Sequence, residues 1–130
     1  MPIRKNPIEE AKRYLENTDE LLSEKAIKQG DFYEDSKYTR MAGNTAWNGV
    51  LIALDAVLSI QAKKRNRPSV DTYRLALSQK DRKILSYFNE AYNILHQSMG
   101  YDGTLDVDVI KKGISHAQRL IEWCELRYQV

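Results

Sequence analysis

Two histidines and one cysteine, His96, His116 and Cys124, are the side chains best suited to bind a transition metal in this chain. Such a site needs several nitrogen or sulfur ligands within bonding distance of one ion. His116 and Cys124 fall on one predicted helix, and at the standard helical rise they lie roughly 12 Å apart. We therefore expect no metal site and no cofactor.

Catalysis by Cys124 would require a nearby base and a lowered thiol pKa. Cys124 instead falls on the apolar stripe of the last predicted helix, which indicates a core position. His96 is the weak catalytic candidate, because a histidine can act as an acid or a base near neutral pH. It stands shortly before a turn at residues 100–103. There the dipole at the end of the helix would also stabilise a protonated ring.

A basic run at residues 63–67 is the clearest candidate for contact with phosphate groups. Its cations are Lys63, Lys64, Arg65 and Arg67. Such a run can bind nucleic acid, with an affinity that falls as salt rises. It contains no aromatic residue on which a base could stack, and a solvated loop is the alternative interpretation. Together with His96 and Tyr101, these cations form the candidate RNA or nucleotide contact.

A small-molecule enzyme is the least supported function class. Carboxylates such as Asp55, Glu90 and Asp102 could converge in three dimensions, but their spacing does not indicate it. The shape of a pocket is also invisible in a sequence. The sequence leaves this class open without naming a site for it.

Hydrophobic periodicity predicts the elements that must position these residues: an all-α, up-and-down bundle of four long helices and one short helix. The long helices are expected at residues 8–29 and 35–63, from about 81 to 99, and at 107–128, with the short one at 69–77. Asn6 and Pro7 form a start signal and Gly30 a stop signal. No strand-type alternation of useful length occurs, and residues 1–130 are expected to form one domain.

The helix expected at residues 35–63 is apolar around most of its circumference. Such a helix must be largely surrounded, either at the centre of the fold or by a second subunit. We expect a homodimer, with another protein partner as an alternative. The candidate interface residues are Ala42, Ala46, Trp47, Gly49, Leu51 and Ala53.

Composition limits the partners and the compartment. The 130 residues are 42% hydrophobic and 29% charged, as in a soluble globular domain, and the net charge of +2 creates no strong field. The single cysteine can form no internal disulfide, and the N-terminus does not resemble a secretory signal. The longest apolar stretch, residues 47–60, is too short and too polar to span a bilayer. We expect a cytoplasmic protein with no membrane contact.

The chain resembles the HEPN superfamily, small helical bundles first described as nucleotide-binding domains. Three features carry the resemblance: the expected helix pair at residues 8–29 and 35–63, the small-residue-rich run at 46–58, and His96 followed by a turn and a last amphipathic helix. The resemblance implies the bundle fold, dimerisation and contact with a nucleotide or RNA.

Active members of that superfamily are metal-independent ribonucleases that use an Arg and a His a few residues after it. The spacing to His96 points to Asn89, Glu90 and Ala91, so the Arg is missing from this chain. Lys111 stands at a matching distance before His116, but it is a lysine in a different helix. The resemblance therefore implies a degenerate, non-catalytic member that acts as a self-associating interaction or regulatory module. The alternative is an RNA- or nucleotide-binding protein with residual ribonuclease activity.

Overall fold

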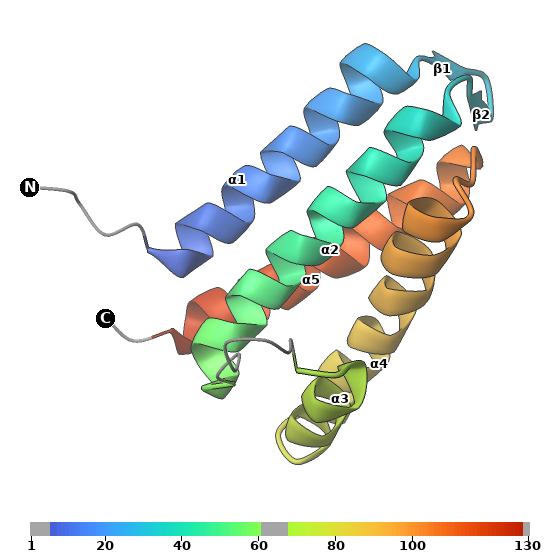
Figure 1. Cartoon of the computed structure of the whole chain (residues 1–130). Coiled ribbons are helices and arrows are strands. Elements are labelled where there is room, and N and C mark those ends of the chain that lie inside the picture. Colours follow the sequence, from blue (N-terminus) through green and yellow to red (C-terminus); the bar gives the residue numbers. More distant parts are fainter. Residues whose placement is uncertain (1–5, 61–67, 129–130) are drawn as a thin grey trace, which may run out of the picture.

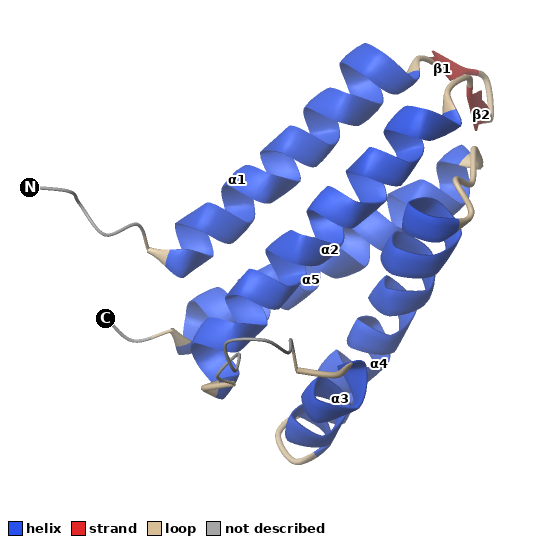
Figure 2. Ribbon diagram, in the orientation of Figure 1, coloured by secondary structure: helices blue, strands red, loops and turns tan. Residues whose placement is uncertain are grey.

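The computed structural model describes residues 6–60 and 68–128, which form an all-α protein with one small hairpin (Figures 1 and 2). The all-α prediction is confirmed. In chain order the elements are α1 (Pro7–Glu20), η1 (Leu21–Ala26), β1 (Lys28–Gln29), β2 (Phe32–Tyr33), α2 (Ser36–Leu58), α3 (Val70–Ser78), α4 (Arg82–Ala91), η2 (Tyr92–Tyr101) and α5 (Val107–Arg127). The π-helical segments η1 and η2 continue α1 and α4 directly, so each pair forms one long rod.

Helix α2 is the central element of the fold. It packs against α1 and η1 on one side and against η2 and α5 on the others, while α4 packs on α5. Figure 1 shows consecutive rods running in opposite directions, with α3 beside α4 at the end far from the hairpin. The helix that is apolar nearly all round is therefore surrounded by its own chain.

Side-chain caps explain where the helices begin. The Asn6 side chain accepts a hydrogen bond from the Ile8 amide at 2.8 Å, and Pro7 is the first helical residue, which confirms the predicted start signal. The side chains of Asp35, Ser69, Asp81 and Asp106 cap α2, α3, α4 and α5 in the same way. Asp81 rather than Ser78 caps α4, because Ser78 is the last residue of α3.

The first rod is shorter than the sequence predicts. Its helical part ends at Ala26 rather than near residue 29, and Ile27 adopts a positive φ of 57°. Lys28 then pairs with Tyr33 across an antiparallel hairpin. Gly30, with φ 62°, belongs to this hairpin and does not stop the helix. Strands of two residues are too short to produce an alternating pattern, so the periodicity could not reveal them.

The hairpin is tied to the start of α5. The Tyr33 amide donates to the Leu105 carbonyl at 2.8 Å, and the Val107 amide donates to the Asp31 carbonyl at 3.0 Å. These bonds hold the hairpin against the loop between η2 and α5. They also place the end of the first rod close to the beginning of the last one.

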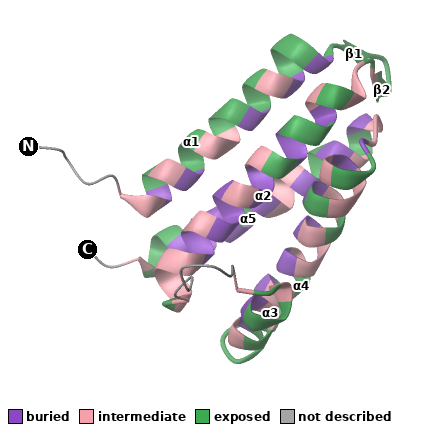
Figure 3. Ribbon diagram, viewed as in Figure 1, coloured by how far each residue is buried: buried purple, intermediate pink, exposed green. Residues whose placement is uncertain are grey.

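The structure corrects the interface that was predicted on α2. The six residues expected to meet a second subunit are all buried inside the chain. Figure 3 shows buried positions along much of α2. They are Ala42, Ala46, Trp47, Gly49, Leu51 and Ala53. Helix α2 also ends at Leu58, and residues 61–63 of the expected helix lie outside the described residues.

The small residues of α2 let neighbouring helices approach within the same chain. A Cβ atom at Gly43 would lie 2.5 Å from the Leu95 carbonyl oxygen, and one at Gly49 would lie 2.9 Å from the Tyr14 Cβ. Helix α2 thus touches η2 at one glycine and α1 at the other. The sequence predicted that this helix is surrounded but left open whether its neighbours belonged to the same chain.

Candidate functional site

Of the candidate RNA-binding residues, the structure places only His96 and Tyr101. Lys63, Lys64, Arg65 and Arg67 lie outside the described residues. His96 and Tyr101 are both exposed on η2. His96 lies in the middle of that segment and not at its carboxyl end. It therefore does not make the expected contact with the negative end of the helix dipole.

His96 borders a small recess of about 270 Å³ between α2, η2 and α3. The recess is lined by Asn44, Trp47, Asn48, Leu51, Pro68, Val70, Tyr73 and His96. The His96 ring lies 6.0 Å from the Trp47 ring and 5.4 Å from the Tyr92 ring, measured between centroids. The histidine is therefore held in an aromatic setting with polar amides nearby.

Arg74 of α3 approaches this aromatic group from a distant part of the sequence. Its guanidinium lies 5.3 Å from the centroid of the Tyr92 ring, and its Nε donates to Asn89 Oδ1 at 2.8 Å. Tyr92 thus contacts both an arginine and His96. Sequence spacing could not find Arg74, because α3 and η2 are brought together only by the fold.

Glu90 links α4 to α5 through two cationic or protonatable side chains. Its Oε2 atom lies 3.0 Å from His116 Nε2 and 3.4 Å from Lys112 Nζ. The positive charge of Lys112, aided by the hydrogen bond from His116, lowers the pKa of the Glu90 carboxyl against the opposing effect of burial. The His116 side chain is 13% exposed, and its ring centroid lies 5.2 Å from that of Tyr87, with the two rings tilted by 31°. This arrangement fits a histidine that fastens two helices together.

The other reactive groups have structural surroundings. Cys124 is fully buried, as predicted, and burial raises the pKa of its thiol to about 12. Asp55 accepts a hydrogen bond from the Tyr73 hydroxyl. Asp55 therefore bonds to Tyr73, whereas Glu90 bonds to His116 and Lys112. Within residues 6–60 and 68–128, no three His, Cys, Asp or Glu side chains are grouped so that they could hold a metal ion.

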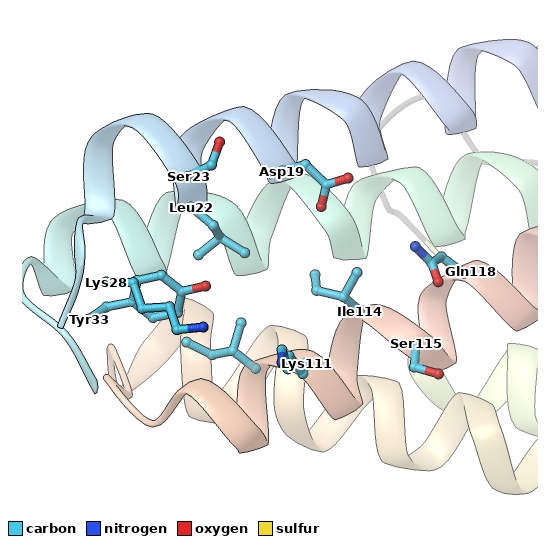
Figure 4. Close-up of a pocket in the computed structure, with 10 residues that line it drawn as sticks. Asp19, Leu22, Ser23, Lys28, Tyr33, Lys111, Ile114, Ser115 and Gln118 are labelled. Atoms are coloured by element: carbon cyan, nitrogen blue, oxygen red, sulfur yellow. The ribbon is translucent and has the colours of Figure 1, made fainter. Parts of the chain in front are cut away.

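A larger cavity of about 490 Å³ opens between the first rod, the hairpin and α5 (Figure 4). It is lined by Asp19, Leu22, Ser23, Lys28, Tyr33, Ile110, Lys111, Ile114, Ser115 and Gln118. Leu22, Ile110 and Ile114 supply an apolar wall, and the charged and hydroxyl groups surround it. In Figure 4, Lys28 and Tyr33 lie toward one end and Gln118 toward the other.

Two acidic groups of this cavity have raised pKa values, and its two lysines form no described ion pair. Burial raises the pKa of Asp19, and burial followed by the negative charge of Asp19 raises the pKa of Tyr33. Neither Lys28 nor Lys111 forms an ion pair with any residue in the described part of the chain. Spacing along the sequence could not reveal this site, because five elements contribute to it: α1, η1, β1, β2 and α5. Lys111 stood out only for its distance from His116.

None of the helices in the described ranges combines the length and apolar character that a membrane crossing requires. The comparison with curated proteins yields no match. A solved structure, a protein of unknown function from Dyadobacter fermentans, is similar with a TM-score of 0.85 and 44% sequence identity. The similarity covers 93% of this chain and 94% of that one. The family model described as domain of unknown function DUF5618 matches residues 6–126, and the chain belongs to that family.

Proposed function

We propose that the protein is a non-catalytic, HEPN-like helical bundle that self-associates and serves as an interaction or regulatory module. The observation that carries this proposal is a group of exposed apolar side chains at the hairpin end. Ile27, Phe32 and Tyr101 are 50%, 58% and 78% exposed, respectively. All three belong to the hairpin region and the adjoining end of η2 (Figure 1). We call these three residues the hairpin patch.

Backbone strain at the hairpin patch supports a functional role. Ile27 is β-branched, yet it adopts φ 57° and ψ 105°. A β-branched residue with positive φ is strained by an amount on the order of 1–3 kcal/mol, and such strain gathers at functional positions. The strained residue presents a half-exposed apolar side chain. A contact that covers this side chain would recover hydrophobic free energy in return.

We propose a homodimer as the form of this association. Exposed apolar groups gathered at one end of a molecule mark an interaction surface more often than scattered ones do. A two-fold contact would bring the hairpin patch of one copy against the same patch of the other. The proposed interface thus lies at the hairpin end and replaces the one expected on α2.

Sedimentation equilibrium from low to high micromolar concentration tests the association. Wild-type protein should show a reversible monomer–dimer equilibrium. Phe32→Ser and Tyr101→Ser should each weaken the dimer about tenfold or more, since exposed aromatic groups dominate such contacts. Leu75→Ser and Leu126→Ser are matched controls, because both leucines are exposed but lie on α3 and at the end of α5. A wild-type protein that stays monomeric at high micromolar concentration would contradict the proposed self-association.

The HEPN-like part of the proposal is supported by the helix pair α1–α2, the small residues of α2, and His96 ahead of a turn and α5. Asn89, Glu90 and Ala91 stand where the superfamily's catalytic arginine would be expected, which favours a non-catalytic member. We also propose a cytoplasmic setting. A reducing compartment suits the one buried, free thiol in the described chain, that of Cys124.

The recess beside His96 supports a second candidate function, binding of RNA or a nucleotide. Next to the recess, the Arg74 guanidinium lies 5.3 Å from the Tyr92 ring, and the Tyr92 and His96 rings lie 5.4 Å apart. Arg74 also forms an ion pair with the exposed Asp71. Arginine and aromatic groups of this kind hold phosphates and unstacked bases in RNA-binding proteins. The basic run at residues 63–67 adds to this candidate by sequence alone.

A titration with mixed single-stranded RNA at low and at moderate salt tests the second candidate. Binding should be tighter at low salt, and both Arg74→Gln and His96→Ala should weaken it about fivefold or more. Arg13→Gln is a matched control, because this exposed arginine lies on α1. No binding at low salt, where the electrostatic attraction is strongest, would remove this candidate. The same His96→Ala protein would show whether any RNA cleavage depends on that ring.

A further inference from the structure

The cavity between the first rod, the hairpin and α5 has the size and lining of a small-molecule site. At about 490 Å³ it falls in the usual range for pockets that enclose small ligands. Leu22 reaches it from η1, and Ile110 and Ile114 reach it from α5, so its apolar wall spans two rods. An apolar ligand body would find a continuous surface there.

Positive charge and a hydrogen-bond donor accompany the apolar wall. Lys28 comes from β1 and Lys111 from α5, and neither is neutralised by a described carboxylate. Figure 4 shows the Lys28 ammonium directed into the cavity, with Tyr33 from β2 beside it. The Tyr33 hydroxyl, like any tyrosine hydroxyl, is protonated at neutral pH and can donate a hydrogen bond, and its raised pKa acts in the same direction.

We propose that this cavity binds a small amphipathic carboxylate. The apolar body of the ligand packs on Leu22, Ile110 and Ile114, and its carboxylate is held by Lys28 and Lys111. The charge of the lining favours an anion, because two lysines outnumber the single carboxylate of Asp19. Both lysines are exposed at the edge of the cavity, so water screens this ion pair and its contribution to the affinity is modest.

Asp19 places a negative charge in the same cavity as the two lysines. Its negative charge opposes a bound anion and would favour a bound cation. Substitutions at Asp19 and at the two lysines therefore act in opposite directions on the affinity for a carboxylate. If the cavity bound its ligand only through apolar contact, none of these substitutions would change the affinity.

The test is an NMR titration of the ¹⁵N-labelled full chain with octanoate, and in parallel with octylammonium and 1-octanol. The three probes share one chain length and differ in charge. Octanoate should shift the amide signals of the cavity residues Leu22, Lys28, Tyr33, Ile110 and Ile114. It should bind about fivefold or more tightly than either other probe, which is the effect of one partly exposed ion pair.

Variants separate the charges of the cavity from those nearby. Lys28→Gln and Lys111→Gln should each weaken octanoate binding about fivefold, and Asp19→Asn should strengthen it. Lys112→Gln is the matched control, since Lys112 follows Lys111 directly but pairs with Glu90 outside the cavity. It should bind octanoate within about twofold of wild type. Far-UV circular dichroism checks that each variant keeps its helices.

Three outcomes would overturn the proposal. Equal binding of 1-octanol or octylammonium would show that the lysines do not select an anion. Octanoate shifts confined to the His96 recess or the hairpin patch would place the ligand elsewhere. An unchanged affinity in folded Lys28→Gln and Lys111→Gln proteins would remove the proposed carboxylate contact.

Discussion

Asp19 and Tyr33 show how the wall of one cavity alters the acids that line it. The Asp19 carboxylate is partly removed from water and has no ion-pair partner in the described chain. Water stabilises an ionised carboxylate, so its loss favours the protonated form. The same negative charge then makes ionisation of Tyr33 more difficult. A change at Asp19 should therefore be measurable in the titration of Tyr33.

Asp19→Asn should lower the pKa of Tyr33 and raise the free energy of unfolding at pH 7. The pKa of Asp19 is raised in the folded protein. Its contribution to stability is therefore fully present below the unfolded pKa and is lost as pH rises through the folded pKa. At pH 7 the ionised Asp19 opposes folding, and asparagine removes that effect. The gain should be small, up to about 0.5 kcal/mol, because the carboxylate is still partly solvated.

Urea denaturation at pH 7 measures this gain in the free energy of unfolding. The pKa of Tyr33 in the variant is measured separately, by subtracting the ultraviolet pH titration of Asp19→Asn/Tyr33→Phe from that of Asp19→Asn. Glu20→Gln serves as the control, because Glu20 is exposed like the adjacent Asp19 but does not line the cavity. It should leave the Tyr33 titration where it was. An Asp19→Asn protein that is less stable than wild type at pH 7 would contradict the stated sign.

Asp81 connects two elements, because one carboxylate serves both α4 and α5. Its Oδ1 caps α4 by accepting from the amides of Lys83 and Ile84, at 3.0 and 3.2 Å. Its Oδ2 accepts from Trp123 Nε1 of α5 at 3.2 Å. The bond from the Ile84 amide, supported by the Trp123 donor, lowers the pKa of Asp81 although burial opposes this. One residue thus fixes the start of a helix and its docking.

Asp81→Asn and Asp81→Ala should separate these two roles. Asparagine is a good N-cap and keeps the bonds to the amides, but its amide nitrogen cannot accept from Trp123. The asparagine variant should therefore show altered Trp123 fluorescence with most of the melting temperature retained. The alanine variant should lose both contacts and melt at a lower temperature. Equal melting temperatures for the two variants would contradict a capping role.

The same carboxylate predicts an acid dependence. The pKa of Asp81 is lowered on folding, so its stabilisation is present above the unfolded pKa and is lost as pH falls through the folded pKa. Thermal melts between pH 7 and pH 3 should show a smaller loss of stability for Asp81→Ala than for wild type. Asp71→Ala is a suitable control, since Asp71 is exposed and lies in α3. Its melts should lose stability with acid about as wild type does.

The contacts of α2 with its neighbours depend on two glycines of different tolerance. Gly43→Ala would push a Cβ against the Leu95 carbonyl, which belongs to the backbone of η2. Gly49→Ala would meet the Tyr14 Cβ at 2.9 Å and the Ala11 carbonyl at 3.2 Å, a less severe overlap. Gly43→Ala should therefore cost about 1–3 kcal/mol of stability, and Gly49→Ala less. Chemical denaturation of both variants measures the order, and a more stable Gly43→Ala protein would contradict the close packing of α2 on η2.

At the scale of the whole molecule, the sequence predicted the rods better than it predicted what surrounds them. Heptad-like apolar spacing and cap residues such as Asn6 and Asp106 act locally, so periodicity locates the long helices within a few residues. The apolar circumference of α2 required surrounding neighbours. Nothing in the pattern specified whether they belong to the same chain, and the six predicted interface residues were therefore misplaced. Periodicity could not identify them as core.

The missed features have two physical causes. The hairpin has strands of two residues, too short for a periodic signal. The cavity between the first rod and α5, and the contact of Arg74 with Tyr92, bring together residues far apart in sequence. Such sites depend on how completed elements pack, and that packing is decided by the summed burial of many side chains. The spacing of a few polar residues carries no record of it.

The central position of α2 predicts how the molecule opens. This helix contacts α1, η1, η2 and α5, whereas α3 packs mainly on α4 and the hairpin is held by a few backbone bonds. Amides that are freed only when the whole core opens exchange most slowly with solvent. Native-state hydrogen exchange should therefore be slowest at residues 46–54 and faster in the hairpin and α3. Mass spectrometry of deuterated peptides measures this order, with each rate corrected for its intrinsic value. Equal protection of α3 and α2 would mean that α3 opens only together with the core.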